Sequence, residues 1–421
     1  MATTQPPLKF TGHKHLAHRL VLSTLLGKPI HVSSIRASSP TSPGLAPHEI
    51  SLLRLLESIT NGSHIEISYT GTTLLYRPGL ITGSIPGRGA DANGQITHTV
   101  DGRMQRGISY LLIPLLQLAP FSKSRINILF TGPGVITSAV EKHNDISVDT
   151  ARTALLPLYT HFGLDLSRDI ELRTLRRSNP SSTTKTHSGA GELHLLFAHQ
   201  LRLVKTLHLL HPGKIHRIRG VAYATGLSPS TCTRLIATAR DLLTPFCPDI
   251  YLYSDAGPAS LTATPTKTNA TLKTKIGLGF GLSLVAEGTG VATTYCSDAA
   301  SGPDGGEVPE DIARRACYRL LETIARGGVV SAALAPTVLT LMAMGSEDVG
   351  RVVLGKDVVG AENVIALARD MAVFGGAGWG IRECGSISDV EDGEGEKRER
   401  ENEVVVSIVG RGVGNVGRKI G

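Results

Sequence analysis

Hydrophobic residues in the first part of the chain recur with the spacing of alternating helices and strands. His13–Leu26 carries leucine and valine at helical spacing, and Gly27 ends the pattern. A short strand is predicted over Ile30–Ile35, and Pro47 opens a second helix. Apolar and polar residues then alternate over Ile65–Tyr69, which predicts a strand, and another strand follows it.

This order of helix, strand, helix, strand, strand recurs twice. The second copy has predicted helices at Arg106–Leu118 and Val148–Phe162 and predicted strands at Ile126–Phe130 and Ile170–Leu175. The third copy is looser, with helices at Ile312–Arg326, Ala332–Met344 and Glu362–Phe374 and a strand at Arg351–Leu354. The outer parts of the chain are therefore predicted to be repeats of one α/β unit.

The middle of the chain has a different order of elements. Strands are predicted at Leu193–Phe197, Ile215–Tyr223 and Ile250–Tyr253, with one helix at Ser228–Leu243. We therefore expect a small α/β domain inserted in a large one, with the large domain at 1–185 and 286–421 and the insert at 186–285. Three segments are expected to be loops: Asn179–Gly191, Ser254–Lys275 and Gly385–Asn402, the last of them disordered.

No membrane partner is expected. The apolar stretch Val329–Met344 is shorter than the about 20 residues that span a bilayer, and it contains Pro336, so it predicts a buried helix. Met1–Phe10 has no apolar core typical of a secretory signal. The five cysteines form no CxxC pair, which fits a reducing compartment and argues against a zinc site or a disulfide framework.

Charge divides the chain unevenly. Residues 1–240 hold 26 Lys or Arg against 12 Asp or Glu, whereas the rest holds 17 against 24. A basic half of this size suits a phosphate-rich partner, although a merely soluble basic surface explains it equally well. The aromatic content of 4% argues against extensive stacking on single-stranded nucleic acid.

The densest basic segment is Gly213–Gly220, where Lys214, Arg217 and Arg219 are candidates for neutralising phosphates. The alternative is an edge strand protected by charge. Glu192 is the only acid between residues 181 and 240, so few negative partners are available nearby, and this favours the phosphate hypothesis. Arg103, Arg106 and the pair Arg176-Arg177 are similar but weaker signals, and Arg106 lies at a predicted helix start, which favours an anion.

Two motifs suggest cofactors and carry little weight. Gly412–Gly417 matches GxGxxG after a strand-like segment, but only four residues follow it, so no helix is left to hold a pyrophosphate. His13, His15 and His18 cluster on the first helix without a cysteine or a suitably placed acid, so a basic surface is favoured over a metal site. No metal and no cofactor are therefore expected.

Several segments together resemble RNA 3′-terminal phosphate cyclases. Ile35–Pro47 is similar to the family's "IRA…PGLxP" signature, and the tail from Gly412 also has a counterpart. Other segments are closer to the cyclase-like branch of the eukaryotic nucleolus: Arg19–Leu22, Arg106–Tyr110, Leu118–Lys123, Ser147–Asp149, Lys214–Tyr223, Phe280–Glu287, Pro309–Asp311 and Leu341-Met342. The resemblance covers nearly the whole chain. It implies a large domain of repeated two-helix, four-stranded-sheet units with a smaller inserted α/β domain, and it adds Arg19 and Arg36 to the candidate phosphate-binding residues.

The resemblance also implies that cyclase activity is lost. Cyclases form a covalent histidine–AMP intermediate, and the matching segment here, Gly355–Asn363, has Gly360 near the place of the nucleophile. All fifteen histidines precede residue 217, so the second half supplies no imidazole. We therefore expect function to lie in the basic first half and not in the ancestral pocket. The amino-terminal "GGGQ" of cyclases is also altered, to Thr11–Lys14.

The remaining role that the resemblance implies is that of a nucleolar factor in early small-subunit (18S) pre-rRNA processing. Its expected partners are a large ribosome-biogenesis GTPase, pre-rRNA and other components of the small-subunit processome. An alternative is an endoribonuclease that cleaves pre-rRNA itself, with Arg369 and Asp370 as weak catalytic candidates; Ala372 replaces the lysine of the branch's Arg-Asp-x-Lys pattern. A surface helix that docks a partner explains that helix as well. An active ATP-dependent cyclase is the least favoured alternative.

Overall fold

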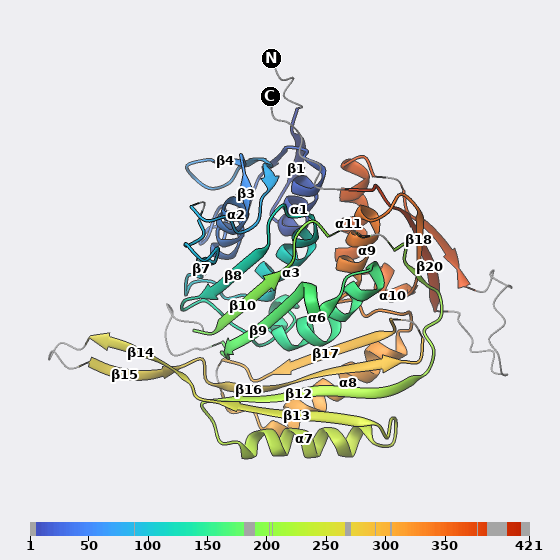
Figure 1. Cartoon of the computed structure of the whole chain (residues 1–421). Helices are drawn as coiled ribbons and strands as arrows, with labels where there is room; N and C mark the ends of the chain where they lie inside the picture. Colours follow the sequence, from blue (N-terminus) through green and yellow to red (C-terminus); the bar gives the residue numbers. More distant parts are fainter. Residues whose placement is uncertain are drawn as a thin grey trace.

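The computed structural model describes residues 6–413, except 88, 181–189, 202, 204, 266–270, 291, 304, 377 and 385–401. Within these residues the chain forms four four-stranded sheets, each accompanied by helices, and two small two-stranded sheets (Figure 1). This confirms the predicted mixed α/β class. Most of the two predicted loops at 179–191 and 385–402, and most of the glycine-rich tail, lie outside the described residues.

The first unit closely follows the hydrophobic pattern. It contains β1 (Leu8–Thr11), α1 (Leu16–Leu26), β2 (Ile30–Ser33), α2 (Pro47–Ile59), β4 (His64–Ile67) and β5 (Leu74–Arg77). The sheet order is β1-β2-β5-β4; β1 and β2 are parallel, and the other neighbours are antiparallel. Gly27 ends α1 at a φ of 63°, a conformation that glycine adopts without strain. The short strands β3 (Thr60–Asn61) and β6 (Leu80–Ile81) pair beside this unit.

The second unit repeats the arrangement. It contains β7 (Ile96–Thr99), α3 (Ser109–Leu118), β8 (Ile126–Thr131), α4 (Val148–Thr150), α5 (Leu156–Leu158), α6 (Leu166–Asp169), β9 (Ile170–Arg176) and β10 (Glu192–Phe197). Its sheet order, β7-β8-β10-β9, has the same parallel and antiparallel neighbours as the first. The predicted helix over Val148–Phe162 is present but irregular: a π-helical turn joins α4 to α5, and a 3-10 turn ends it.

The third unit has the same sheet topology but is interrupted. It contains β11 (His208–Leu209), α9 (Ala335–Met344), β18 (Val349–Gly355), α10 (Lys356–Val359), α11 (Glu362–Val373), β19 (Gly380–Glu383) and β20 (Glu403–Val409). The order β11-β18-β20-β19 again places one parallel pair before two antiparallel pairs. More than a hundred residues separate the first strand of this unit from its first helix, and they form the insert.

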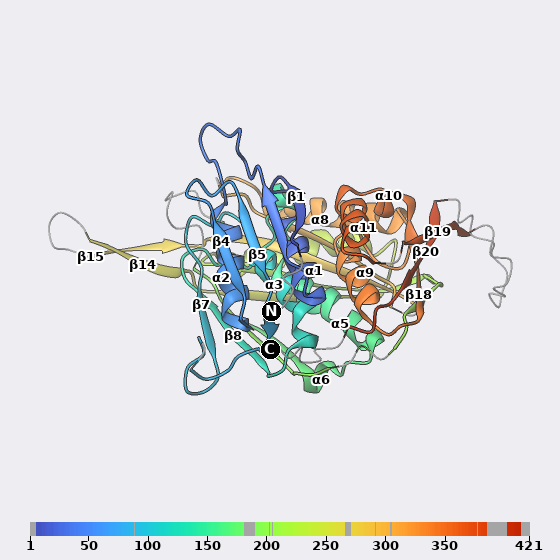
Figure 2. The same cartoon turned by 90° about the horizontal axis from the view of Figure 1, so that it is seen from above.

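The insert is a four-stranded sheet with two helices on one face. It contains β12 (Ile215–Thr225), α7 (Ser230–Leu243), β13 (Ile250–Gly257), β14 (Ser260–Pro265), β15 (Thr271–Ile276), β16 (Gly279–Gly288), β17 (Thr294–Ala300) and α8 (Pro309–Ala325). The sheet order is β13-β12-β16-β17, and β14 and β15 form a separate hairpin that projects from the body (Figure 2). The prediction of a loop at Ser254–Lys275 was therefore wrong.

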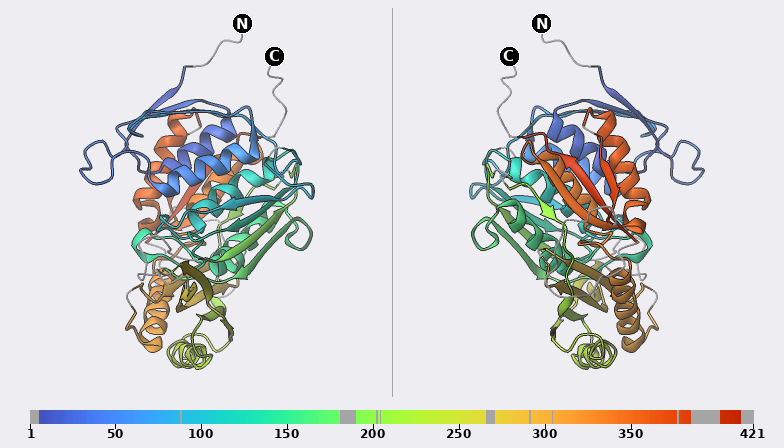
Figure 3. Two further views of the ribbon diagram at one scale, coloured as in Figure 1. Left: turned by 90° about the vertical axis from the view of Figure 1, so that its left-hand side faces the viewer. Right: turned by 90° about the vertical axis from the view of Figure 1, so that its right-hand side faces the viewer.

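Strand pairing and packing give the insert later limits than the predicted 186–285. β10 lies inside that range but pairs with β8 and β9 of the second unit. Conversely β17 and α8 lie beyond it, yet they share a second hydrophobic core with α7 that runs from Ile218 to Leu320. In Figure 3, α7 and α8 lie on the side of this sheet away from the three units. The domain division itself stays a prediction.

The main core lies among the helices of the three units, where α1, α2, α3, α9 and α11 pack against one another. All ten residues of α9 are buried, as predicted for the apolar stretch that ends at Met344. No helix among the described residues has the length and apolar character needed to cross a bilayer.

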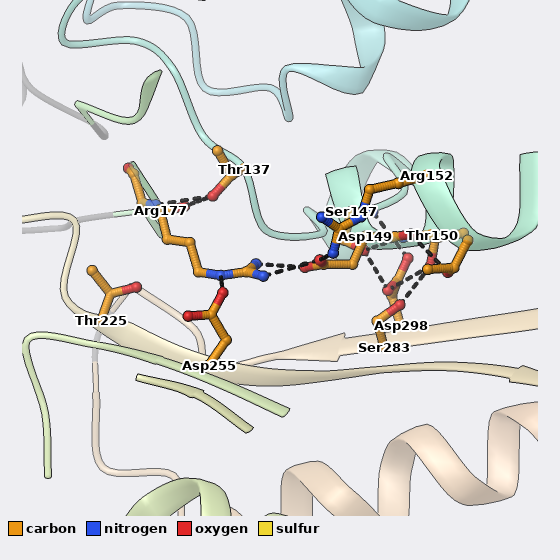
Figure 4. Close-up of polar contacts among 12 residues, drawn as sticks. Thr137, Ser147, Asp149, Thr150, Arg152, Arg177, Thr225, Asp255, Ser283 and Asp298 are labelled. Atoms are coloured by element: carbon orange, nitrogen blue, oxygen red, sulfur yellow. Dashed lines mark hydrogen bonds and ion pairs between the residues drawn. The ribbon is translucent and has the colours of Figure 1, made fainter. Parts of the chain in front are cut away.

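A buried ion-pair network joins the second unit to the insert (Figure 4). Arg177 follows β9, and its two terminal nitrogens donate to Asp149 of α4 at 2.5 and 3.0 Å. Its Nε donates to Asp255 of β13 at 2.6 Å, and its guanidinium lies over the ring of Tyr223. The side chains of Arg177 and Asp149 are 8% and 1% exposed. The guanidinium of Arg177 is thus engaged in structural contacts and is almost inaccessible to solvent.

Asp298 of β17 forms a second buried contact beside it. Its carboxylate accepts the Ser147 N–H at 2.9 Å and the Ser147 and Thr150 hydroxyls at 2.8 and 2.9 Å. Burial raises the pKa of this carboxyl, and the hydrogen bonds from Ser147 and Thr150 partly oppose that effect. The Ser147–Thr150 segment therefore fixes the insert sheet against the second unit.

Candidate functional site

A cleft of about 890 Å³ lies where the three units meet the insert. The first residues of five helices line it: α1, α2, α3, α9 and α11. β17 and the end of α8 complete its walls. Because the amino-terminal end of a helix carries a partial positive charge and free N–H groups, this convergence favours an anionic group in the cleft.

Nevertheless, the cationic side chains of the cleft all have acidic partners. Arg36 donates to both oxygens of Glu49 at 2.7 and 2.9 Å, and Arg106 donates to both oxygens of Asp145 at 2.7 and 2.5 Å. The remaining pairs are Lys14–Glu362, Arg319–Glu141 and Arg326–Glu322. Such pairing lowers the positive potential that these side chains offer to a phosphate. The cleft therefore offers a phosphate less positive potential than its number of lysines and arginines suggests.

Five histidines from the first half of the chain line the cleft: His13, His15, His18, His48 and His143. The second half of the chain supplies none of these imidazoles, but the packing of the units places them in the same cleft as Ala361, Glu362 and Asn363. The rings of His15 and His18 stack at 6.2 Å, and that of His48 meets Tyr110 edge-on at 4.8 Å.

Burial lowers the pKa of all five imidazoles, and it lowers those of His18 and His48 to about 4. These rings are therefore neutral at pH 7 and bring no positive charge. Within the residues that the structure describes, no three His, Cys, Asp or Glu side chains are placed to hold a metal ion.

The neutral histidines predict a specific loss of stability in mild acid. In the unfolded chain His18 and His48 bind protons below their ordinary pKa of 6.5, but in the folded chain they stay neutral down to about 4. Acid therefore favours the unfolded state, and the free energy of unfolding should fall as the pH falls from 6.5 to 4. Urea denaturation over this range measures the slope.

The double variant His18→Gln/His48→Gln should show a shallower slope than the wild type. His64→Gln is the matched control, because the His64 side chain is 60% exposed on β4. Equal slopes in the wild type and the double variant would mean that these two imidazoles do not cause the effect.

The six predicted phosphate-binding residues do not gather at one place. Arg36 and Arg106 line the cleft, whereas Arg19 lies behind it and donates to Asp370 at 2.9 Å. The other three are on β12 or directly before it: Lys214, Arg217 and Arg219.

The acids that the local sequence lacks come from neighbouring elements of the insert. Arg217 donates to Asp249 at 3.0 Å, and Arg219 pairs with Glu287 of β16. The prediction that these arginines lack negative partners was therefore wrong. Acids are few nearby in the sequence, but neighbouring elements bring them close across the sheet. Arg103 and Arg176 are paired as well, with Asp101 and Glu192.

The two weak catalytic candidates face different surroundings. Asp370 is 6% exposed and is held in the ion pair with Arg19, whereas Arg369 is exposed on the other side of α11. Neither lines the cleft. Adjacent residues on a helix point about 100° apart, so the two side chains start in different directions, and the catalytic role stays a prediction.

The segment that resembles the nucleophile region of cyclases, Gly355–Asn363, reaches the edge of the cleft. Gly360 ends α10, and the next three residues, Ala361, Glu362 and Asn363, line the cleft. Among them only Glu362 is ionisable, and Lys14 binds its carboxylate at 2.8 Å. This turn therefore offers no nucleophile of the histidine type.

Sequence reasoning missed the acidic side of the cleft: Glu49, Glu141, Asp145 and Asp298. Only Glu49 had a recognisable local signal, because a glutamate three residues after a helix cap typically bonds back to the backbone, as Glu49 does with the Ala46 N–H at 2.7 Å. The other acids lie in a 3-10 turn, in a loop or on a strand, where spacing carries no such information.

The chain is similar in sequence to known proteins over most of its length. Residues 8–371 match the sequence model of the RNA 3′-terminal phosphate cyclase family. The mouse RNA 3′-terminal phosphate cyclase-like protein is 41% identical over 359 residues, which cover 84% of this chain and 85% of the mouse protein. The rRNA processing protein rcl1 of Schizosaccharomyces pombe is 35% identical over 417 residues, 98% of each chain. The rRNA processing protein RCL1 of Saccharomyces cerevisiae is 34% identical over 362 residues, 86% of this chain and 87% of the yeast protein. The chain therefore belongs to the RNA 3′-terminal phosphate cyclase family.

Proposed function

We propose that this protein is a nucleolar factor for early small-subunit (18S) pre-rRNA processing and that it has no RNA 3′-terminal phosphate cyclase activity. The observation that carries the proposal is the turn between α10 and α11, where Gly360 lies near the position that the resemblance assigns to the cyclase nucleophile and no histidine is present. A covalent histidine–AMP step needs that nucleophile. Two relatives similar over most of their length are named rRNA processing proteins.

The cleft geometry supports the loss of cyclase activity in a second way. Its lysine and arginines are held by carboxylates, and its histidines are kept neutral by burial. A nucleoside triphosphate brings several negative charges, and these pairs offset the positive charge that would attract it. We propose that the cleft is retained for architecture and partner contact, and that the expected partners are a large ribosome-biogenesis GTPase and pre-rRNA-containing particles.

The proposed function predicts a clear cellular result. A tagged protein should co-sediment with early pre-ribosomes and co-purify with the GTPase, and its depletion should lower small-subunit rRNA without an equal loss of large-subunit rRNA. Sucrose-gradient sedimentation and rRNA quantification measure both. If the tagged protein sediments apart from pre-ribosomes and its depletion leaves small-subunit rRNA unchanged, the proposal is contradicted.

A separate assay tests the missing chemistry. Incubation of the purified protein with radiolabelled ATP should leave no covalent protein–AMP adduct. An adduct that forms in the wild type and disappears when one of the five cleft histidines is replaced would show that another imidazole acts as the nucleophile.

A further inference from the structure

The insert sheet has one face covered by helices and one face that is partly open. Along β12 and β13, the side chains that pack under α7 and α8 include Ile218, Ala222 and Leu252. Because successive residues of a strand point to opposite faces, the residues between them lie on the other face. Towards one end, the contact of Arg177 with Asp255 closes this second face.

Two tyrosines lie next to each other on the open part of this face. Tyr251 and Tyr253 are two residues apart on β13, the edge strand, and are 47% and 63% exposed. Exposing a large aromatic side chain to water costs free energy. Residues two apart on a strand lie on the same face about 7 Å from each other, so the two rings form one aromatic surface. The main and second hydrophobic cores include neither ring.

Two arginines lie beside the tyrosines on the next strand. In the parallel pairing of β12 and β13, Arg219 is opposite Tyr251, and the Arg217 guanidinium lies 5.6 Å from the centre of the Tyr251 ring. The side chains of Arg217 and Arg219 are 42% and 37% exposed. Each is paired with one carboxylate, but a guanidinium has five N–H donors, so each retains donors for another acceptor.

The path along β13 continues to a cationic hairpin. β13 leads into β14, and β15 returns to the sheet carrying the exposed Lys275. Between Asp255 and Glu287 the chain contains three lysines and no acid. A negatively charged strand lying along β13 would therefore meet positive charge where it leaves the tyrosines.

We propose that Tyr251 and Tyr253, with Arg217 and Arg219 beside them, form a platform on which two bases of single-stranded RNA stack. Stacking on aromatic rings and on guanidinium planes is the usual way in which proteins hold unpaired RNA bases, and one common RNA-binding module uses a four-stranded sheet with exposed aromatics for it. Two rings suffice for two bases, which agrees with the low aromatic content of the chain. The inference deepens the proposed function, on which it rests, by naming the RNA-contacting face.

Binding of a single-stranded RNA 12-mer by the full-length protein tests the platform. Tyr251→Ala/Tyr253→Ala should weaken binding by about 10-fold for each ring removed. Tyr251→Phe/Tyr253→Phe keeps the rings and should bind within about twofold of the wild type. Tyr69→Ala/Tyr318→Ala is the matched control, because these tyrosines are 107% and 58% exposed and lie outside the insert sheet; it should bind like the wild type.

An abasic oligomer of the same length separates stacking from charge. It should bind more weakly than the RNA and be insensitive to the loss of the tyrosines, whereas Arg217→Ala should reduce the salt dependence of RNA binding. Unchanged RNA binding by the Tyr→Ala pair, or an equal loss for the abasic oligomer, would overturn the platform.

Gradient sedimentation of cell extracts distinguishes a failure of this inference from a failure of the proposed function. If the Tyr→Ala pair keeps its affinity for RNA but leaves the pre-ribosomes, the face docks a protein and the platform is overturned. If the wild type binds RNA through the tyrosines but never enters pre-ribosomes, the platform stands and the proposed function fails.

Discussion

Replacing Asp149 with alanine is expected to lower the free energy of unfolding by about 3–5 kcal/mol. The side chain of Arg177 is only 8% exposed. The substitution removes its bidentate acceptor and leaves Asp255 as its remaining carboxylate partner. A buried charge that loses its partner retains its desolvation cost without the compensating attraction. Urea denaturation, followed by circular dichroism, measures the loss.

Asp101→Ala is the matched control for this prediction. Asp101 also forms a bidentate contact with an arginine, Arg103, but the two side chains are 46% and 70% exposed. Exposed ion pairs contribute about 0–1 kcal/mol, so this variant should unfold almost like the wild type. Similar losses in both variants would mean that burial is not what makes the Asp149 contact strong.

The second large effect is expected at Asp370. Asp370→Ala leaves Arg19 partly buried, at 13% exposure, without its acceptor, and should also cost about 3–5 kcal/mol in unfolding free energy. The neighbouring substitution Arg369→Ala changes an exposed side chain and should cost less than about 0.5 kcal/mol. Urea denaturation of the two single variants tests the difference.

A paired apolar substitution separates a structural role of Asp370 from a catalytic one. Arg19→Met/Asp370→Leu removes both charges together and should recover most of the stability lost in Asp370→Ala. If pre-rRNA cleavage by the purified protein were abolished in this stable variant and in Arg369→Ala, the endoribonuclease alternative would gain support. Equal cleavage of pre-rRNA by the wild type and both variants, or no cleavage by the wild type, would exclude Arg369 and Asp370 from catalysis.

The helices and strands were predictable wherever one face had to be apolar. α1, α2 and α9 follow their hydrophobic spacing because each packs against the shared core. The hairpin of β14 and β15 was missed because its two strands pair with each other outside both cores, and a threonine-rich sequence shows no apolar face. These strands form because β14 and β15 pair with each other, and such pairing requires no alternation of apolar residues that hydropathy could reveal.

The site was less predictable than the fold because its partners are distant in sequence. Arg19 and Asp370 belong to the first and third units, and Lys14 meets Glu362 in the same way. The absence of a histidine from Gly355–Asn363 is a local property that can be read directly from the sequence. The sequence could not indicate that five histidines from the first half line the same cleft as Ala361–Asn363, since their positions follow from how the units pack.

The interruption of the third unit has a consequence for the order in which the protein folds. β11 pairs with β18, which the ribosome makes only after the whole insert. The strands of the first two units are contiguous in sequence and can close while synthesis continues, whereas the third sheet must wait for its long-range partner. Until α9 and α11 emerge, the apolar faces of α1 and α3 that pack against them stay uncovered, so a nascent chain arrested before α9 should be a preferred client of chaperones.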